Sequence, residues 1–165
     1  MNINGKNLEI VLIAAVAKNN VIGDKGKIPW RIKEDIKRFK KLTFGNSVLM
    51  GKDTYFSIRD EFRPLEGRAN IVLTGNKDIA EMIKREGAIH SYSVQEAMKI
   101  ASKLNDSVYV IGGQRVYEDT INLASKLEIT EIDKEYNGDA FFPKFDKKEW
   151  KKIYKDKKLR ARLNS

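Results

Sequence analysis

Short apolar runs that alternate with helix-like segments constrain the fold of this chain more than any other feature. The run at residues 10–17 (IVLIAAVA) shows no alternation of polar and apolar residues, which is typical of a strand covered on both faces. Further strand-like runs lie at 47–50, 70–74, 107–111, 126–132 and 149–155. Strands separated by helices predict a largely parallel sheet with helices on both faces. We therefore expect a single α/β domain over residues 1–165.

Two helices between these strands have recognisable ends. Asp78 is expected to cap a short helix that Gly87 closes. Ser93, with Glu96 three residues later, has the spacing of a capping box and predicts a helix over 94–103. The helices thus fall where the alternating pattern requires them.

The content of reactive side chains excludes several kinds of chemistry. Cysteine is absent, which removes disulfides, thiolate nucleophiles and Cys-type zinc sites, and the single histidine, His90, makes a His-based metal site or a Ser-His-Asp triad very hard to build. The longest apolar run falls far short of the roughly 20 residues that span a bilayer, and the start of the chain has no cleavage-site pattern. We expect a cytoplasmic protein with no metal and no membrane partner.

The basic charge of the chain is concentrated in its last 22 positions. The net charge is +9, from 32 Lys and Arg against 23 Asp and Glu, but residues 144–165 contain ten of the basic and three of the acidic residues. The rest of the chain therefore has nearly equal numbers of basic and acidic residues. A charged run of this kind is more often a solvated face than a phosphate-binding surface. A nucleic-acid partner is retained only as a minor alternative.

A carboxylate on an apolar helix face is the first candidate for a functional group. The loop at 18–31 ends in Pro29-Trp30, and the helix that follows places Ile32, Ile36, Phe39 and Leu42 within one sector. Asp35 falls inside the same sector. Burying an unpaired carboxylate costs several kcal/mol, so Asp35 needs a partner. In a purely structural role, Asp35 pairs with a Lys or Arg or lies at the rim of the face. In a functional role, it binds a cationic or amidine-like ligand.

Three further segments follow strands, at the sheet edge where ligands bind in such folds. Residues 111–117 (IGGQRVY) place two glycines at a strand-to-helix turn, which suits a phosphate or serves only as a tight turn. Residues 50–54 (MGKDT) place Lys52 at a helix start, for an anionic ligand or as a surface cation. Gly67-Arg68 offers a guanidinium suited to a carboxylate, although lone arginines are usually surface residues.

An ordered set of short motifs runs through the chain and identifies a family. The motifs are Ile13-Ala14-Ala15, Val21-Ile22-Gly23, Pro29-Trp30, Asp35, Phe39, Met50-Gly51-Lys52-x-Thr54, Ser57-Ile58, Arg63-Pro64-Leu65-x-Gly67-Arg68-x-Asn70-Ile71, Ile111-Gly112-Gly113, Val116-Tyr117, Thr130, Gly138-Asp139 and Phe142-Pro143. The set resembles dihydrofolate reductases of the common chromosomal type, collinearly from about residue 10 to about residue 150. The resemblance implies an antiparallel strand near the C-terminus and reduction of 7,8-dihydrofolate to tetrahydrofolate by hydride transfer from NADPH.

The resemblance also implies roles for individual residues. Asp35 accepts hydrogen bonds from the 2-amino group and N3 of the pterin and so favours protonation of N5, Thr130 reaches Asp35, and Trp30 closes over the site with the loop around Ile28. The implied substrate-binding residues are Ile13, Ala15, Ile28, Phe39, Ile58, Leu65, Arg68, Ile111 and Tyr117. The implied cofactor-binding residues are Ala15, Ile22, Gly51, Lys52, Asp53, Thr54, Leu73, Thr74, Gly112, Gly113, Gln114, Arg115 and Val116, with a cis peptide between the two glycines and Lys52 beside the 2′-phosphate.

The chain departs from the family pattern at three places. The segment 59–63 is longer than the bacterial spacing, and Lys52 stands where arginine is frequent, which weakens the preference for NADPH over NADH. Residues 155–165 are short, basic and poor in large apolar residues, so the final strand is missing or divergent. A missing strand leaves an unpaired sheet edge. We expect a monomer, with a dimer through that edge, or reduced stability, as the alternatives.

Three other functions compete with this interpretation. A pyrimidine reductase of riboflavin synthesis resembles the same fold and uses NADPH, but Asp35 after Pro-Trp and the Gly67-Arg68 pair favour folate. A basic-tailed nucleic-acid-binding module is disfavoured because the chain lacks interleaved aromatic and basic strand residues. An inactive family member is disfavoured because Asp35 and the Gly-Gly turn are present.

Overall fold

The structure is a computed structural model that describes residues 1–152, and its centre is a six-stranded sheet. The strands in the sheet are β3 (Glu9–Ala17), β5 (Ser47–Gly51), β6 (Ala69–Leu73), β7 (Ile89–Ser91), β8 (Ser107–Gly112) and β9 (Lys126–Ile132). Their order is β7-β6-β5-β8-β3-β9, and every neighbouring pair is parallel. Five of the predicted strands are confirmed, whereas β7 is too short and too polar to have been recognised.

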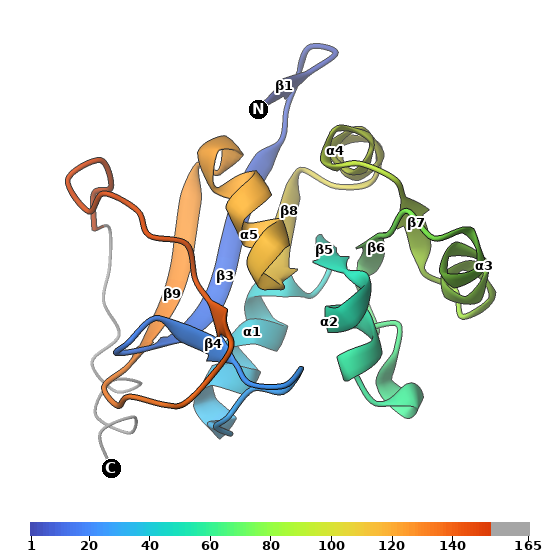
Figure 1. Cartoon of the computed structure of the whole chain (residues 1–165). Coiled ribbons are helices and arrows are strands. Elements are labelled where there is room, and N and C mark those ends of the chain that lie inside the picture. The colour runs from blue at the N-terminus through green and yellow to red at the C-terminus, as the bar shows by residue number, and fades with distance from the viewer. Residues whose placement is uncertain (153–165) are drawn as a thin grey trace.

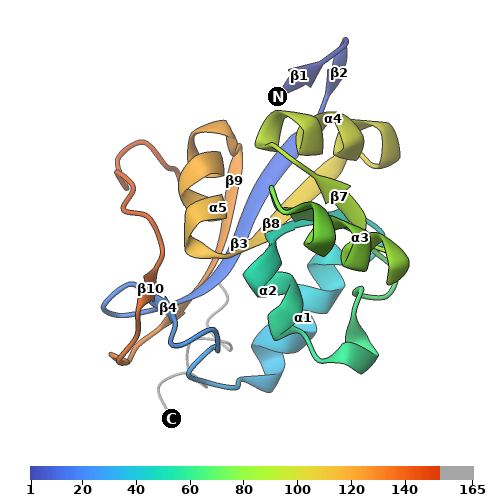
Figure 2. The same ribbon diagram turned by 45° about the vertical axis from the view of Figure 1, so that its right-hand side comes forward.

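Helices cover both faces of this sheet, as Figures 1 and 2 show. They are α1 (Lys33–Thr43), α2 (Lys52–Ser57), α3 (Lys77–Arg85), α4 (Val94–Leu104) and α5 (Gln114–Thr120), with 3₁₀ turns η1 (Asp60–Phe62) and η2 (Ile121–Leu123). In β5, Leu49 packs with α4 and α5, whereas its neighbours Val48 and Met50 pack with α2 and α3 on the other face. All three are fully buried, which explains why the apolar runs do not alternate.

The predicted helix ends are partly confirmed. Ser93 Oγ accepts a hydrogen bond from the Glu96 N–H at 3.1 Å, so Ser93 caps α4. Gly87 follows α3 with a φ of +95°, as a closing glycine does. The prediction for Asp78 is wrong, because Asn76 is the cap of α3. Its Oδ1 accepts the N–H groups of Asp78 and Ile79, two of the donors that the first turn leaves unsatisfied.

Two small antiparallel pairs lie outside the central sheet. The hairpin of β1 (Asn2–Ile3) and β2 (Lys6–Asn7) lies next to α4 in Figure 2, where Lys6 Nζ donates to the carbonyls of Ser102 and Asn105. The second pair joins β4 (Val21–Gly23) to β10 (Ala140–Phe141). The implied antiparallel strand near the C-terminus therefore occurs within the described residues as β10.

The predicted strand at 149–155 does not form in the part that the structure describes. Residues 149–152 are irregular, and the N–H groups of Glu149 and Trp150 donate to carbonyls three residues earlier, as in a turn. The Trp150 ring lies 6.4 Å from that of Phe145, so it packs locally. The remainder of that segment, and the predicted missing or divergent final strand at 155–165, lie outside the described residues. Among residues 1–152 no strand pairs with the outer edge of β9.

Within the part of the chain that the structure describes, no helix combines the length and apolar character needed to cross a membrane.

Candidate active site

A cleft of about 1290 Å³ opens at the carboxyl ends of the central strands. Gly51, Leu73 and Gly112, the last residues of β5, β6 and β8, all line it, as expected for the ligand site of a parallel sheet. All but three of the predicted site residues contribute to its wall. Those that do are Ile13, Ala15, Ile22, Ile28, Asp35, Phe39, Gly51, Lys52, Asp53, Thr54, Ile58, Leu65, Leu73, Thr74, Ile111, Gly112, Gly113, Gln114, Arg115, Val116 and Tyr117.

Asp35 lines this cleft from the first turn of α1. Its Oδ1 accepts a hydrogen bond from Thr130 Oγ1 of β9 at 2.6 Å. Burial raises the pKa of Asp35 above its ordinary value, while the Thr130 hydrogen bond and the nearby Arg38 act to lower it. Within residues 1–152, Asp35 forms no ion pair with a lysine or arginine. The hydrogen bond that it accepts from the protein is donated by the neutral hydroxyl of Thr130. Thr130 lies behind Asp35 and does not itself line the cleft.

A buried ion pair beside Asp35 was not predicted from the sequence. Arg38, one turn further along α1, pairs with Glu128, whose side chain is only 5% exposed. Glu128 precedes Thr130 by two positions and so shares its face of β9. Two side-chain links therefore join α1 to β9, the Asp35–Thr130 hydrogen bond and the Arg38–Glu128 ion pair. The only sequence signal for this contact is the spacing of the two pairs: Arg38 follows Asp35 by three positions on the helix, and Thr130 follows Glu128 by two on the strand.

A second buried group near Asp35 is the phenol of Tyr117. It lines the cleft and donates a hydrogen bond to the Ile13 carbonyl at 2.7 Å. Burial, and to a lesser extent the charge of Asp35, raises the pKa of Tyr117 well above its ordinary value. The phenol therefore stays protonated and joins α5 to β3 at the wall of the cleft.

Trp30 and Ile28, both expected near the mouth, are placed differently. Ile28 lines the cleft and its side chain is largely exposed. Trp30 does not line the cleft, because its ring packs against Tyr136 with 5.0 Å between ring centroids. The loop that carries both residues is thereby tied to the segment after β9.

Arg68 stands behind the cleft wall rather than on it. Its guanidinium lies 6.0 Å from the centre of the Phe39 ring and donates to Thr43 Oγ1 at 3.1 Å, while Nε donates to the Glu66 carbonyl. Burial lowers the pKa of Arg68 from its ordinary value. Because Arg68 forms no ion pair with a carboxylate of residues 1–152, its charge is available to an anionic ligand at this end of the cleft.

The Gly112–Gly113 turn closes the cleft between α2 and α5, and its peptide bond is cis, as the resemblance implied. Gly112 has a φ of +127°, a conformation that residues with a side chain rarely adopt. A Cβ on either glycine would lie 3.4–3.5 Å from Thr54 Oγ1. The glycines thus keep open the space next to the Thr54 hydroxyl.

Two cations line the cleft near this turn. Lys52 Nζ lies 3.2 Å from Asp53 Oδ1, and Arg115 Nε lies 3.8 Å from Asp119 Oδ2. Such exposed ion pairs contribute little free energy, so both cations are free to turn toward an anionic ligand.

The sequence did not identify every residue of the cleft. The others are Ala14, Gly23, Gly26, Lys27, Ile36, Ser57, Gly75, Tyr92, Ser93, Val94, Asp119 and Ala140. Tyr92, Ser93 and Val94 follow β7, the strand that the apolar pattern did not reveal. Recognising β7 would have placed the start of α4 at the same sheet edge as the other site segments.

Comparisons with known proteins agree with one another. A family model described as dihydrofolate reductase matches residues 9–164. The dihydrofolate reductase of Buchnera aphidicola from Acyrthosiphon pisum is 39% identical over 158 residues, covering 95% of this chain and 93% of that protein. The dihydrofolate reductase of Bacillus subtilis is 36% identical, with 87% and 81% covered. A solved structure of Enterococcus faecalis dihydrofolate reductase, complexed with NADP(H) and RAB-propyl, superimposes with a TM-score of 0.74 at 34% identity, covering 84% of this chain and 79% of that one.

Proposed function

The chain belongs to the dihydrofolate reductase family, and we propose that its cleft reduces 7,8-dihydrofolate to 5,6,7,8-tetrahydrofolate with NADPH. The observation that carries this proposal is the Asp35 carboxylate, which lines an apolar cleft with a neutral hydroxyl as its protein hydrogen-bond donor. An amidine-like edge of a heterocycle supplies the donors that such a carboxylate lacks. The family match favours this function over a pyrimidine reductase or a nucleic-acid-binding module.

The substrate end of the cleft is formed around Asp35. We propose that Asp35 accepts hydrogen bonds from the 2-amino group and N3 of the pterin, with Thr130 fixing the orientation of the carboxylate. Phe39, Ile58 and Leu65 form apolar walls for the rings of the substrate. Other substrate contacts come from Ile13, Ala15, Ile28, Ile111 and Tyr117.

Arg68 is assigned to the carboxylate end of the substrate. Its guanidinium lies above Phe39 and pairs with no carboxylate of the described residues. A bidentate contact from such a guanidinium to a substrate carboxylate is geometrically favoured.

The remainder of the cleft fits a dinucleotide. The whole cleft, at about 1290 Å³, exceeds the roughly 300–1,000 Å³ of a site for one drug-sized ligand, which leaves room for a second ligand beside the substrate. We propose that residues 112–116 hold the pyrophosphate, that Lys52, Asp53, Thr54, Leu73 and Thr74 form the adenosine side, and that Ala15 and Ile22 flank the nicotinamide. Lys52 is the natural cation for a 2′-phosphate.

The chemistry divides between the two ends of the cleft. NADPH, when bound, supplies the hydride that C6 of the pterin receives. The proton that balances the reaction goes to N5 and arrives from water, because Asp35 holds the opposite edge of the ring. By holding the ionised carboxylate against N3 and the amino group, the protein favours protonation at N5. Ile28 and the loop that ends at Trp30 limit the access of water.

The function is tested by following NADPH oxidation by the purified chain with and without dihydrofolate. We expect turnover in the unmodified chain and a steep loss in Asp35→Asn, greatest near neutral pH, with NADPH binding retained. Turnover that survives in Asp35→Asn would contradict the role of the carboxylate. An absence of NADPH binding in the unmodified chain would overturn the whole assignment.

We further propose that the chain acts as a cytoplasmic monomer. Sedimentation equilibrium measures the mass directly, and a value of twice the 18.9 kDa of one chain would instead support a dimer formed through an exposed sheet edge.

A further inference from the structure

The segment between Ile58 and Leu65 carries one wall residue of the cleft at each end. Residues 59–62 between them are exposed and form only the short turn η1. Ordering such an exposed segment costs conformational entropy, and without buried contacts it opens locally at low free energy. The position of both wall residues therefore depends on what anchors this segment.

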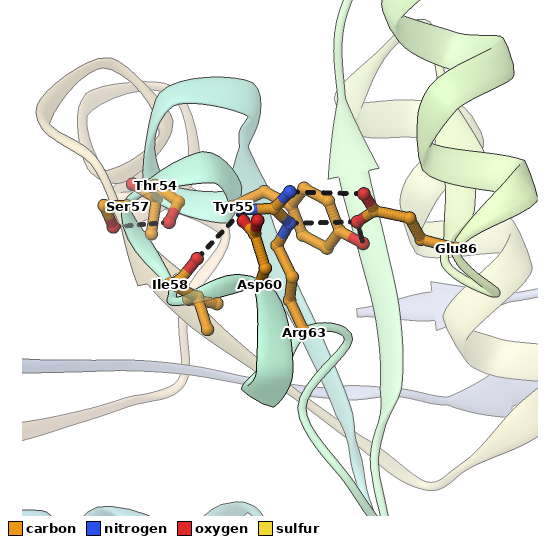
Figure 3. A network of polar contacts seen from close by, with 7 residues as sticks. All are labelled: Thr54, Tyr55, Ser57, Ile58, Asp60, Arg63 and Glu86. Carbon is orange, nitrogen blue, oxygen red and sulfur yellow. Dashed lines mark hydrogen bonds and ion pairs between the residues drawn. The ribbon is translucent and has the colours of Figure 1, made fainter.

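Arg63 is the anchor at the centre of the segment, and its side chain is only 11% exposed. Its Nε and Nη2 donate to the two carboxylate oxygens of Glu86 at 2.9 and 3.2 Å, and Figure 3 shows this forked contact. Its Nη1 donates to the Ile58 carbonyl at 3.1 Å and lies 2.8 Å from Asp60 Oδ1. The guanidinium also lies 5.0 Å from the centre of the Phe56 ring.

Glu86 connects this anchor to the core. It also accepts a hydrogen bond from the hydroxyl of Tyr55, which is fully buried on α2, at 2.6 Å. Glu86 caps the C-terminus of α3, where the helix dipole disfavours a negative charge. The hydrogen bonds from Arg63 lower the pKa of Glu86, because they stabilise its ionised form. At this end of α3, the guanidinium of Arg63 thus offsets the unfavourable interaction between the Glu86 charge and the helix dipole.

The far end of the segment is clamped separately. The Leu65 N–H donates to Asn70 Oδ1 at 2.8 Å, and Asn70 Nδ2 donates back to the Leu65 carbonyl at 2.9 Å. Ile58 has no equivalent side-chain clamp among residues 1–152 other than Arg63 Nη1. A displacement of Arg63 thus moves Ile58 first and changes the width of the wall between Ile58 and Leu65.

We propose that Arg63, held by Glu86 and Tyr55, is a positioning residue that fixes the Ile58–Leu65 wall and thereby sets the affinity for dihydrofolate. The proposal rests on the substrate assignment made above. Arg63, Glu86 and Tyr55 do not line the cleft, so they act on the substrate only through the wall. Of the cofactor-side residues, Lys52 lies at the start of α2, directly after β5, whereas Thr54 lies in the middle of α2 and directly precedes Tyr55. Because Arg63 contacts Ile58 directly and reaches Thr54 only through Glu86 and Tyr55, we expect the anchor to affect dihydrofolate affinity more than NADPH affinity.

The test compares Arg63→Gln, Arg63→Lys and Glu86→Gln with Arg59→Gln as the matched control. Arg59 lies on the same segment, but its side chain is exposed and forms an ion pair only with the exposed Glu61 among the described residues. The Kd of dihydrofolate and of NADPH are measured separately by titration, together with KM, kcat and Tm. We expect Arg63→Gln to weaken dihydrofolate binding by about tenfold, because the wall at Ile58 is then no longer pre-organised and has to be ordered when the ligand binds. NADPH binding and kcat stay within about twofold of the unmodified chain.

The two milder variants keep the proposal testable if Arg63→Gln folds poorly. Arg63→Lys retains the charge but loses the fork, so it gives a smaller rise in the dihydrofolate Kd than Arg63→Gln. A fall in Tm with an unchanged dihydrofolate Kd would overturn the proposal, as would equal losses for both ligands. Dihydrofolate that fails to bind the unmodified chain would instead overturn the proposed function, and this inference with it.

Discussion

Thr130 on β9 donates a hydrogen bond from its hydroxyl to the Asp35 carboxylate on α1, with 2.6 Å between Oγ1 and Oδ1. The bond links two elements that are 95 positions apart in the sequence. It acts against the desolvation that raises the pKa of Asp35. The hydroxyl therefore controls two properties of the acid at once, its orientation toward the cleft and the pH at which it ionises.

Removing the Thr130 hydroxyl tests both properties. Because this hydrogen bond lowers the pKa of Asp35, Thr130→Val raises that pKa further. The acid limb of the kcat/KM profile for dihydrofolate then moves to higher pH, since the ionised carboxylate binds the pterin. At pH 7 we expect kcat/KM to fall about tenfold, as for the loss of one hydrogen bond to a charged group. Thr130→Ser retains the hydroxyl and serves as the control, and an unmoved acid limb in Thr130→Val would contradict the assignment.

The Arg38–Glu128 ion pair is predicted to contribute specificity of packing rather than net stability. Removing the carboxylate alone, in Glu128→Leu, takes a counter-charge away from a largely buried guanidinium and is expected to cost about 3 kcal/mol. The double variant Arg38→Met/Glu128→Leu replaces both charges with apolar groups and is expected to unfold close to the unmodified chain. Urea unfolding of the two single variants and the double variant measures the coupling. Additive losses would show that the two side chains do not act as a pair.

The elements that the sequence predicted well are those whose burial is decided locally. Val48, Leu49 and Met50 are apolar in succession because both faces of β5 are covered, and such a run is recognisable without knowing its neighbours. Asp35 was identified as a functional candidate for a similar reason, since the helical period alone places it among apolar residues. The roles given to Asp35 and Thr130 came from family resemblance.

The features that the sequence did not predict depend on contacts between distant segments. The residues next to Arg38 in the sequence do not indicate that it pairs with Glu128, 90 positions away, and only the matching spacings from Asp35 to Arg38 and from Glu128 to Thr130 are compatible with this contact. Asn76 and Asp78 are both good capping residues, and the choice between them depends on where the chain turns after β6. Trp30 was expected over the cleft from the family resemblance, whereas its packing against Tyr136 is a tertiary contact that the sequence does not show.

Gly112, in the turn before α5, is predicted to be intolerant of a side chain. Gly112 has a φ of +127°, and placing alanine there is expected to cost about 1–3 kcal/mol of backbone strain. Its Cβ would also fill the space 3.5 Å from Thr54 Oγ1, a hydroxyl that we assign to the cofactor. Gly112→Ala should therefore weaken NADPH binding more than dihydrofolate binding. Separate titrations of the two ligands check this, and equal losses would count against the assignment of the turn to the cofactor.

Asp35→Asn is predicted to stabilise the fold while it abolishes most of the activity. The pKa of Asp35 is raised in the folded state from an ordinary value of 3.8, so the folded chain binds this proton more tightly than the unfolded chain does. This group therefore favours folding at low pH, and that contribution is lost as the pH rises through its folded pKa. At pH 7 the ionised carboxylate carries a desolvation cost that a neutral amide avoids, while the amide oxygen of the variant still accepts the hydrogen bond from Thr130. We expect the urea midpoint of Asp35→Asn to exceed that of the unmodified chain at pH 7, and the difference to shrink as the pH is lowered toward 4. A lower urea midpoint for Asp35→Asn at pH 7 would show that the carboxylate stabilises the fold. In that case the chain would lose no stability by having an acid at this position for its activity.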